Sequence, residues 1–455
     1  MNPSIEAARR ERIDAVLALA APRLQPAERA HVEAFARAYF HHLDVDDLAA
    51  RSPEDLLGAL LSSWQFGAER APGTTRLRII SPSLAEQGWA SRHTVIELVN
   101  DDMPFLVDST TMEIYRQGLS LHLIVHPVLV VERDAQGKLQ SLRELRADEA
   151  DPRAVRESWM HIEVDRLVDP AQRAELAAGL ERVLDDVRAA VRDWAPMRER
   201  LNEAVAELQA APPTVPPALA AESRAFLQWL ADDHLTLLGY RRHVLAREQG
   251  EDLLRLVPGS GLGVLRESRQ DVSASFAAVP APARAMAHAP TPVLLVTRSN
   301  TRSTVHRPGY SDYVGIKRYN AAGEVIGEHR FIGLFSATAY SARVEEIPLL
   351  RHKVAAVVQR AALPEGGHLA KALAHILATY PRDDLFQIGE DELYDTALGI
   401  LAAGERPRLR LFLWRDPYER FVSCLVYLPR DWMTTELRLR IQSLLCRAFN
   451  GRLSN

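Results

Sequence analysis

Residues 94–109 decide the fold and read Thr94-Val-Ile-Glu-Leu-Val-Asn-Asp-Asp-Met-Pro-Phe-Leu-Val-Asp-Ser109. The first six residues carry an apolar centre and are typical of a short β-strand. Polar residues end that strand, and Asp102 is a suitable N-cap with Pro104 in the first turn of a helix. The helical spacing continues to Gly118, which is typical of a helix end. This stretch therefore predicts a strand, a tight polar turn and a helix.

Further strands and a helix are expected around this stretch. Residues 76–80 form a short strand before it, and residues 119–132 form an apolar run that ends in a turn near 134–138. Residues 159–166 alternate again, and a helix follows Asp169-Pro170. The order strand, helix, strand, strand, helix is that of a split βαβ or ferredoxin-like unit. On the last strand we expect three residues to face the core and three to face solvent, respectively Met160, Ile162, Val164 and His161, Glu163, Asp165.

The rest of the chain divides at changes in pattern. Residues 1–75 have helical periodicity and predict an N-terminal helical module, and the Pro-rich segment 211–217 is a linker. Residues 218–363 are richer in strands, with a hairpin around 320–323. Residues 364–455 predict a strand at 384–388, helices at 390–402 and 434–449, and two strands at 408–415 and 420–427. This last unit is one strand short of βαββαβ. The predicted class is α+β with tandem units, helical inserts and a truncated last unit.

Composition narrows the class of protein. A net charge of −5 in 455 residues argues against nucleic-acid binding, which needs a concentrated basic surface. Two cysteines are too few for a disulfide framework. No apolar run reaches the roughly 18 residues that span a bilayer, and the charged N-terminus lacks a signal core. We therefore expect a bacterial cytoplasmic protein with no nucleic-acid or membrane partner.

No pattern for catalysis, cofactor or metal binding stands out. The segment Gly259-Ser-Gly-Leu-Gly263 has the wrong spacing for a dinucleotide motif and predicts a turn. His122 and His126 fall on a strand, where residues four apart lie roughly 13 Å from each other and cannot share one ion. Asp232-Asp-His234 fits a corner between a helix and a strand, without a visible nucleophile. We expect no catalytic, cofactor or metal site in this chain.

The polar turn is the best candidate binding site, and its residues are Asn100, Asp101, Asp102, Met103 and Pro104. Free amides at the start of a helix bind a ligand carboxylate. The acidic and amide side chains of the turn accept hydrogen bonds from a ligand ammonium group. A free amino acid carries both charges and matches this arrangement. The alternative is a well-capped turn that binds no ligand.

Several stretches together resemble the large bacterial NAD-specific glutamate dehydrogenases. Besides residues 100–109, they are 158–165 (Ser-Trp-Met-His-Ile-Glu-Val-Asp), 235–241 (Leu-Thr-Leu-Leu-Gly-Tyr-Arg), 305–313 (Val-His-Arg-Pro-Gly-Tyr-Ser-Asp-Tyr), 330–335 (Arg-Phe-Ile-Gly-Leu-Phe) and 380–386 (Tyr-Pro-Arg-Asp-Asp-Leu-Phe). The resemblance implies the non-catalytic N-terminal segment of such an enzyme, built from ACT-type domains that often bind amino acids at the turn after the first strand. It assigns ACT-like domains to residues 76–211, 218–363 and 364–455, the last without its final strand. In the common ACT turn a Gly often follows the Pro, whereas this chain has Phe105.

The resemblance also implies a function for the whole enzyme. Such enzymes interconvert glutamate and 2-oxoglutarate with NAD, which binds in a downstream catalytic domain, and they form homo-oligomers. We expect this segment to be inactive alone, to regulate and assemble the enzyme, and to have as partners its own C-terminal catalytic domain, other copies of the chain and an amino-acid effector. The alternatives are a free-standing amino-acid sensor and a purely structural scaffold for oligomer assembly.

Overall fold

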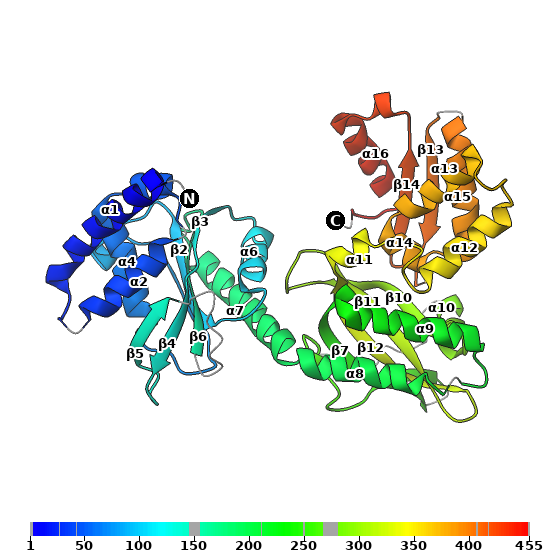
Figure 1. The fold of residues 1–455 in the computed structure, drawn as a ribbon, viewed down its shortest axis with the longest axis horizontal. Helices are drawn as coiled ribbons and strands as arrows, with labels where there is room; N and C mark the ends of the chain where they lie inside the picture. The colour runs from blue at the N-terminus through cyan, green and yellow to red at the C-terminus, as the bar shows by residue number, and fades with distance from the viewer. Residues whose placement is uncertain are drawn as a thin grey trace. The chain divides into compact units, whose positions relative to one another are not determined.

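The computed structural model describes residues 3–26, 28–41, 43–144, 155–210, 212–248, 251–266, 281–405, 408–416 and 418–453. The chain forms two compact units. Unit 1 comprises residues 1–188 and 304–308, and unit 2 comprises 189–303 and 309–455. Figure 1 shows the elements of each unit. No helix in the described ranges combines the length and the apolar character needed to cross a membrane.

Unit 1 is built on an antiparallel sheet in the order β1-β2-β6-β4-β5, with β3 beside β4 along β6. Its strands are β1 (Arg76–Ile80), β2 (Thr94–Asp101), β3 (Leu121–Val125), β4 (Val128–Arg133), β5 (Leu139–Glu144) and β6 (Val155–Val164). The helix α6 (Leu106–Arg116) connects β2 to β3, which lie on either side of β6. This is the predicted split βαβ arrangement. The edge beside β2 is filled by β1, which precedes it in the sequence.

The N-terminal helices share one core with the sheet. They are α1 (Pro3–Ala20), α2 (Arg29–His41), α3 (Val45–Ala49) and α4 (Pro53–Gly67). Phe35 on α2 packs against Trp159 on β6 with ring centroids 5.0 Å apart, and both are buried. Helices α6 and α7 (Pro170–Arg192) lie on the other side of the sheet (Figure 1). The sheet is therefore covered on both faces.

Burial on both faces corrects the prediction for the last strand. His161 and Glu163, expected to face solvent, are 1% and 0% exposed. The N-terminal module covers them, and Arg51 binds both carboxylate oxygens of Glu163 at 2.5 and 2.9 Å. Burial alone disfavours the charged carboxylate, but hydrogen bonds from His161, Arg51 and His93 outweigh it and hold the pKa of Glu163 far below its usual range.

Unit 2 begins with α8 (Trp194–Glu207) and α9 (Pro217–Trp229), which lie beside a second antiparallel sheet in the order β10-β11-β12-β7-β8 (Figure 1). Its strands are β7 (Leu235–Glu248), β8 (Glu251–Leu256), the short β9 (Leu262–Gly263) beside β7, β10 (Leu294–Arg302), β11 (Tyr310–Tyr319) and β12 (Val325–Phe335). The hairpin predicted around residues 320–323 joins β11 to β12, and Gly323 has a φ of 81° there. The expected βαββαβ order is wrong for this sheet, because hairpins join β7 to β8 and β10 through β12 in succession.

The remainder of unit 2 is mostly helical. It contains α12 (Leu350–Ala361), α13 (His368–Thr379), α14 (Arg382–Gln387) and α15 (Glu390–Glu405), then the hairpin of β13 (Arg410–Arg415) and β14 (Val422–Tyr427), and α16 (Thr435–Ala448). The strand predicted at 384–388 is wrong, because these residues belong largely to α14. The half-buried Lys353 donates to the carbonyls of Leu385, Phe386 and Ile388 and so satisfies the end of that helix.

Candidate functional site

The turn after β2 starts later than its sequence predicted. The pairing of β2 with β6 runs to Asp101, and the Asp102 amide extends it by donating to the carbonyl of Arg156 at 2.9 Å. The helix α6 begins only at Leu106, so Phe105 is its N-cap and no side chain caps it. The prediction of Asp102 as the N-cap is therefore wrong, because its amide is held by the neighbouring strand.

Phe105 takes the conformation that glycine favours. Its φ and ψ are 73° and 0°, in the left-handed region. A bulky side chain is rarely found there, since its Cβ crowds the following carbonyl. Glycine would adopt this conformation without that steric cost. In this chain the ring of Phe105 packs against His306, with centroids 4.9 Å apart.

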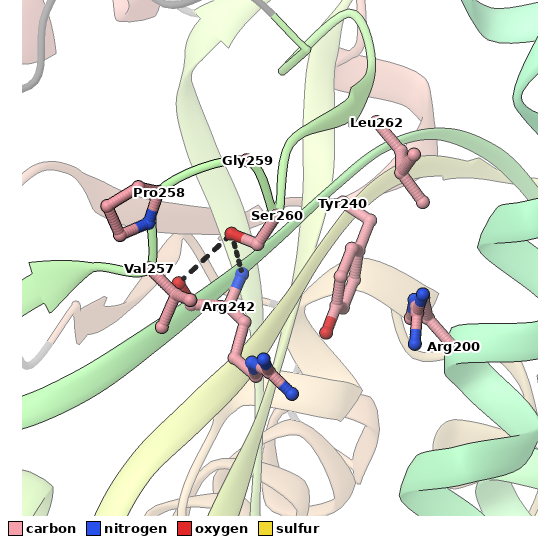
Figure 2. Close-up of a pocket in the computed structure, with 8 residues that line it drawn as sticks. All are labelled: Arg200, Tyr240, Arg242, Val257, Pro258, Gly259, Ser260 and Leu262. Atoms are coloured by element: carbon pink, nitrogen blue, oxygen red, sulfur yellow. Dashed lines mark hydrogen bonds between the residues drawn. The ribbon is translucent and has the colours of Figure 1, made fainter.

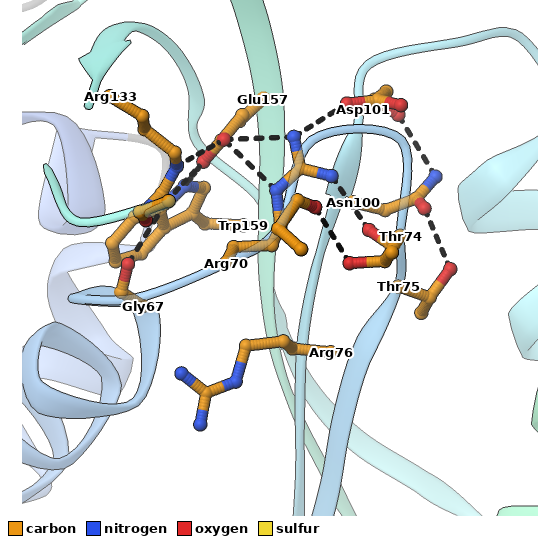
Figure 3. Close-up of polar contacts among 12 residues, drawn as sticks. Gly67, Arg70, Thr74, Thr75, Arg76, Asn100, Asp101, Arg133, Glu157 and Trp159 are labelled. Carbon is orange, nitrogen blue, oxygen red and sulfur yellow. Dashed lines mark hydrogen bonds and ion pairs between the residues drawn. The ribbon is translucent and has the colours of Figure 1, made fainter. Parts of the chain in front are cut away.

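Asn100 lies at the bottom of the turn and is fully buried. Its Oδ1 accepts hydrogen bonds from the Thr75 hydroxyl at 2.8 Å and from Arg188 at 2.6 Å. Its Nδ2 donates to the carbonyl of Asp101 at 2.9 Å. These contacts occupy both the oxygen and the nitrogen of the amide, and Figure 3 shows those with Thr75 and Asp101. Asn100 therefore holds the turn in shape rather than presenting its side chain to a ligand.

Asp101 belongs to a buried ionic cluster shown in Figure 3. Its carboxylate is 2.5 Å from Nη2 of Arg70, whose side chain is only 1% exposed. Arg70 also donates from Nε to Glu157 at 3.0 Å, and Arg133 and Trp159 donate to the same carboxylate. Burial disfavours the charged form of Glu157, but hydrogen bonding with Arg133 and the charges of both arginines outweigh it, so its pKa lies below the usual value. The charge of the Asp101 carboxylate is thus already balanced by Arg70.

The remaining predicted residues are more open. The Asp102 carboxylate is half-buried and has no hydrogen-bond or ion-pair partner among the described residues. Met103 is also half-buried, and Pro104 is exposed. Beyond them, the first amides of α6 have no partner within the helix by its geometry. The groups left to meet a ligand are therefore one carboxylate and the amides of the first turn.

Residues 304–308 belong to unit 1 and lie beside this turn. The amide of His306 donates to the Ser109 hydroxyl at 3.0 Å, and the Thr304 hydroxyl donates to Asp186 at 2.7 Å. Burial raises the pKa of Asp186 above its usual value. Ser109 and His306 lie in stretches that carry the family resemblance, but neither they nor Arg70 and Arg188 were predicted as site residues. The buried Glu157 requires a cation nearby, which Arg70 and Arg133 supply, but the predicted strand began only at residue 159 and so did not include it.

Comparisons with known proteins agree with this architecture. Residues 35–180 match the family model described as glutamate dehydrogenase, ACT1 domain. Residues 347–406 match glutamate dehydrogenase, helical motif 1, and residues 410–455 match its ACT2 domain. The helical motif thus covers much of the region where the sequence predicted the start of a third ACT-like unit.

The chain is similar to three proteins named NAD-specific glutamate dehydrogenase. Identity is 42% over 435 residues with that of Halomonas elongata, covering 94% of this chain and 26% of the relative. It is 38% over 415 residues with that of Pseudomonas aeruginosa (91% and 25%), and 29% over 400 residues with that of Mycobacterium tuberculosis (87% and 23%). The chain therefore spans about a quarter of the length of the relatives it matches.

The fold of unit 1 and the matched domains define an ACT-domain protein. The chain belongs to the NAD-specific glutamate dehydrogenases and corresponds to their N-terminal segment, since it carries the ACT1 domain, helical motif 1 and ACT2 domain in this order.

Proposed function

We propose that this chain is the non-catalytic, regulatory and assembly segment of an NAD-dependent glutamate dehydrogenase. In the full enzyme, glutamate and NAD are converted to 2-oxoglutarate and ammonium in a downstream domain that binds the NAD, in the cytoplasm. The observation that carries the proposal is that the matched parts of the chain are ACT domains and a helical motif. The domain limits at 75, 211 and 363 remain predictions.

The effector site is the turn from Asn100 to Pro104, and its ligand is a free amino acid. The Asp102 carboxylate accepts hydrogen bonds from the ligand ammonium group, and the backbone amides in the first turn of α6 donate to the ligand carboxylate. Asn100 and Asp101 hold the backbone through Arg188 and Arg70. The side chains of Phe105 and His306 border the turn, so the ligand must be small or displace them.

Calorimetric titration with the common amino acids, one at a time, tests this site. We expect at least one to bind, and Asp102→Asn to weaken its binding at least tenfold. Asp46→Asn is the matched control and should leave binding unchanged, because Asp46 is exposed on α3 of the same unit and its side chain has no hydrogen-bond or ion-pair partner among the described residues. No heat with any amino acid would count against the effector site.

The activity of the chain tests the broader proposal. We expect purified chain to form no NADH from glutamate and NAD, and full-length enzyme prepared in parallel to form it. Measurable NAD-dependent glutamate oxidation by the chain alone would refute the non-catalytic assignment. The alternative of a free-standing sensor predicts effector binding without any change in the activity of the full enzyme.

A scaffold for homo-oligomer assembly is the second candidate function. It is favoured by apolar side chains left open on the β13–β14 hairpin and α16. Leu411, Leu413, Leu439 and Leu444 are 46%, 49%, 53% and 50% exposed. Exposed apolar patches of this kind mark interaction surfaces. Analytical ultracentrifugation tests it: a monomer at all concentrations would contradict assembly through this segment.

A further inference from the structure

A pocket in unit 2 lies where the strand beside β7 bulges away. β9 pairs with Gly239 and Tyr240, and β8 pairs with β7 only from His243 onward. Between these two pairings the chain loops out over residues 257–261 and leaves a pocket of about 160 Å³. Its lining includes Arg200 from α8, Tyr240 and Arg242 from β7, and Ser260 from the loop (Figure 2).

The loop over the pocket is held rigidly. The Ser260 hydroxyl accepts a hydrogen bond from the Arg242 amide at 3.1 Å and lies 3.4 Å from the Arg242 carbonyl. The Val257 amide donates to that carbonyl at 2.9 Å, and the Gly263 amide donates to Asp193 at 2.8 Å. A Cβ on Gly263 would lie 2.1 Å from the carbonyl oxygen of Leu238, so the loop needs glycine there. The loop that forms the pocket is therefore fixed by the fold of unit 2.

The walls of the pocket are cationic. In Figure 2 the Tyr240 hydroxyl lies between the guanidinium groups of Arg200 and Arg242. The Arg242 guanidinium is half-buried and has no hydrogen-bond or ion-pair partner within the part of the chain that the structure describes. Arg200 pairs with Glu203 at 2.5 Å, but both side chains are over 40% exposed, so solvent screens this pair. Two guanidinium groups, those of Arg200 and Arg242, thus line the same small pocket.

Tyr240 keeps the pocket floor uncharged. Its hydroxyl shares a 2.8 Å hydrogen bond with Nδ1 of His329. Burial raises its pKa to about 12, although the charges of Arg242 and Arg200 act in the opposite direction. The phenol is therefore neutral at physiological pH and does not repel an anion. Carboxylate and phosphate groups are the oxyanions that a guanidinium group binds with two parallel hydrogen bonds.

We propose that this pocket binds a small oxyanion, a carboxylate or phosphate group, between Arg200 and Arg242. It is a second ligand site, and the inference does not depend on the effector turn of unit 1. The Gly-rich segment 259–263 shapes the pocket as a turn rather than as a dinucleotide motif. Binding weakens as ionic strength rises, because salt screens the attraction between the anion and partly exposed arginines.

Calorimetry on the whole chain in low-chloride buffer tests the site with two separate probes, inorganic phosphate and glutarate. We expect saturable binding of at least one probe, and which one binds identifies the anion class. Arg242→Gln should weaken that binding at least tenfold. Arg343→Gln is the matched control for loss of one positive charge, since Arg343 is 73% exposed with one ion pair at 3.6 Å, and it should leave binding unchanged.

Two outcomes overturn the proposal: no saturable binding of either probe at millimolar concentration, or equal binding by wild type and Arg242→Gln. The circular dichroism spectrum and thermal midpoint of each variant establish that it is folded. If Arg242→Gln unfolds, Arg200→Gln takes its place, because Arg200 is on α8 with its side chain 42% exposed, and its loss leaves the strand intact. Unchanged binding by that folded variant then refutes the site.

Discussion

Replacing Glu157 by Gln should destabilise unit 1 by about 3–5 kcal/mol. The buried Glu157 carboxylate accepts hydrogen bonds from Arg70 at 3.0 Å, from Arg133 at 2.6 and 2.7 Å, and from Trp159 at 2.9 Å. A glutamine has one oxygen and turns an NH₂ group toward these donors, so at least two charge-assisted bonds are lost, each worth roughly 1.5–3 kcal/mol. Breaking a buried ion pair costs a similar amount, about 3–5 kcal/mol.

Hydrogen exchange measured by mass spectrometry on peptides from residues 155–164 checks this magnitude without assuming that both units unfold together. A loss of about 3 kcal/mol corresponds to roughly hundredfold lower protection. Glu132→Gln is the matched control, because Glu132 is exposed on the adjacent strand β4 and binds only the Ser141 hydroxyl, at 2.9 Å. Glu132→Gln should change the free energy of unfolding by no more than about 0.5 kcal/mol. Equal protection in the two variants would show that the cluster contributes little.

The same carboxylate predicts a pH dependence. The pKa of Glu157 is lowered in the folded chain, so the unfolded chain binds its proton more readily. Its contribution to stability is complete above the unfolded pKa of about 4.3 and is lost as the pH falls through the folded value. The thermal midpoint of wild-type unit 1 should therefore drop on acidification more steeply than that of Glu157→Gln. Parallel curves for the two proteins would contradict the assignment.

Two further predictions concern the backbone conformation of Phe105 and the half-buried Lys353. Phe105→Ala and Phe105→Gly both lose the ring contact with His306, but only alanine has a Cβ that disfavours the left-handed conformation. The glycine variant should therefore be about 1 kcal/mol more stable than the alanine variant. Equal free energies of unfolding for the two variants, measured in urea, would refute this. Lys353→Met should destabilise unit 2 by roughly 2–4 kcal/mol, because three carbonyls at the end of α14 lose their donor. Lys371→Met is its control on an exposed position of α13, and calorimetric midpoints of the two variants should differ clearly.

Local patterns predicted much of unit 1, and long-range contacts decided where they failed. The strand, turn and helix around Asn100 follow from alternation and helix signals, and the structure contains all three. The exact start of the helix did not follow, because the Asp102 amide bonds to Arg156, a residue 54 positions away in sequence. Likewise, the residues next to Glu163 in the sequence do not indicate its ion pair with Arg51, which lies 112 positions away. Polar alternation is the signal of a half-exposed strand, so it misleads wherever a second layer supplies the partners.

The predicted strand at 384–388 failed for a different reason. Short apolar runs do not distinguish a buried strand from a helical turn. Asp383 and Asp384 follow Pro381 and are typical of the first turn of a helix, and this is where α14 begins. These residues, typical of a helix N-terminus, predict a helix rather than a strand. The carbonyls at its end are then satisfied by Lys353 from α12, a contact that no local pattern contains.

The two matched ACT regions show how little of a domain is decided locally. In unit 1 the paired strands β1 and β2, with the short helix α5 (Leu84–Gln87) between them, are followed by α6. In unit 2 the hairpin of β13 and β14 is followed by α16, so each region contains two paired strands and then a helix. β2 also pairs with β6 and is buried almost throughout, whereas β14 pairs only with β13 among the described residues and its neighbour β13 leaves Leu411 and Leu413 about half exposed. Hairpin and helix can therefore form from local sequence, but burial needs the strands that pair with the second edge. Exposed apolar side chains on this hairpin and on α16 have the character of an interface, which makes residues 410–448 the place to expect association of this chain.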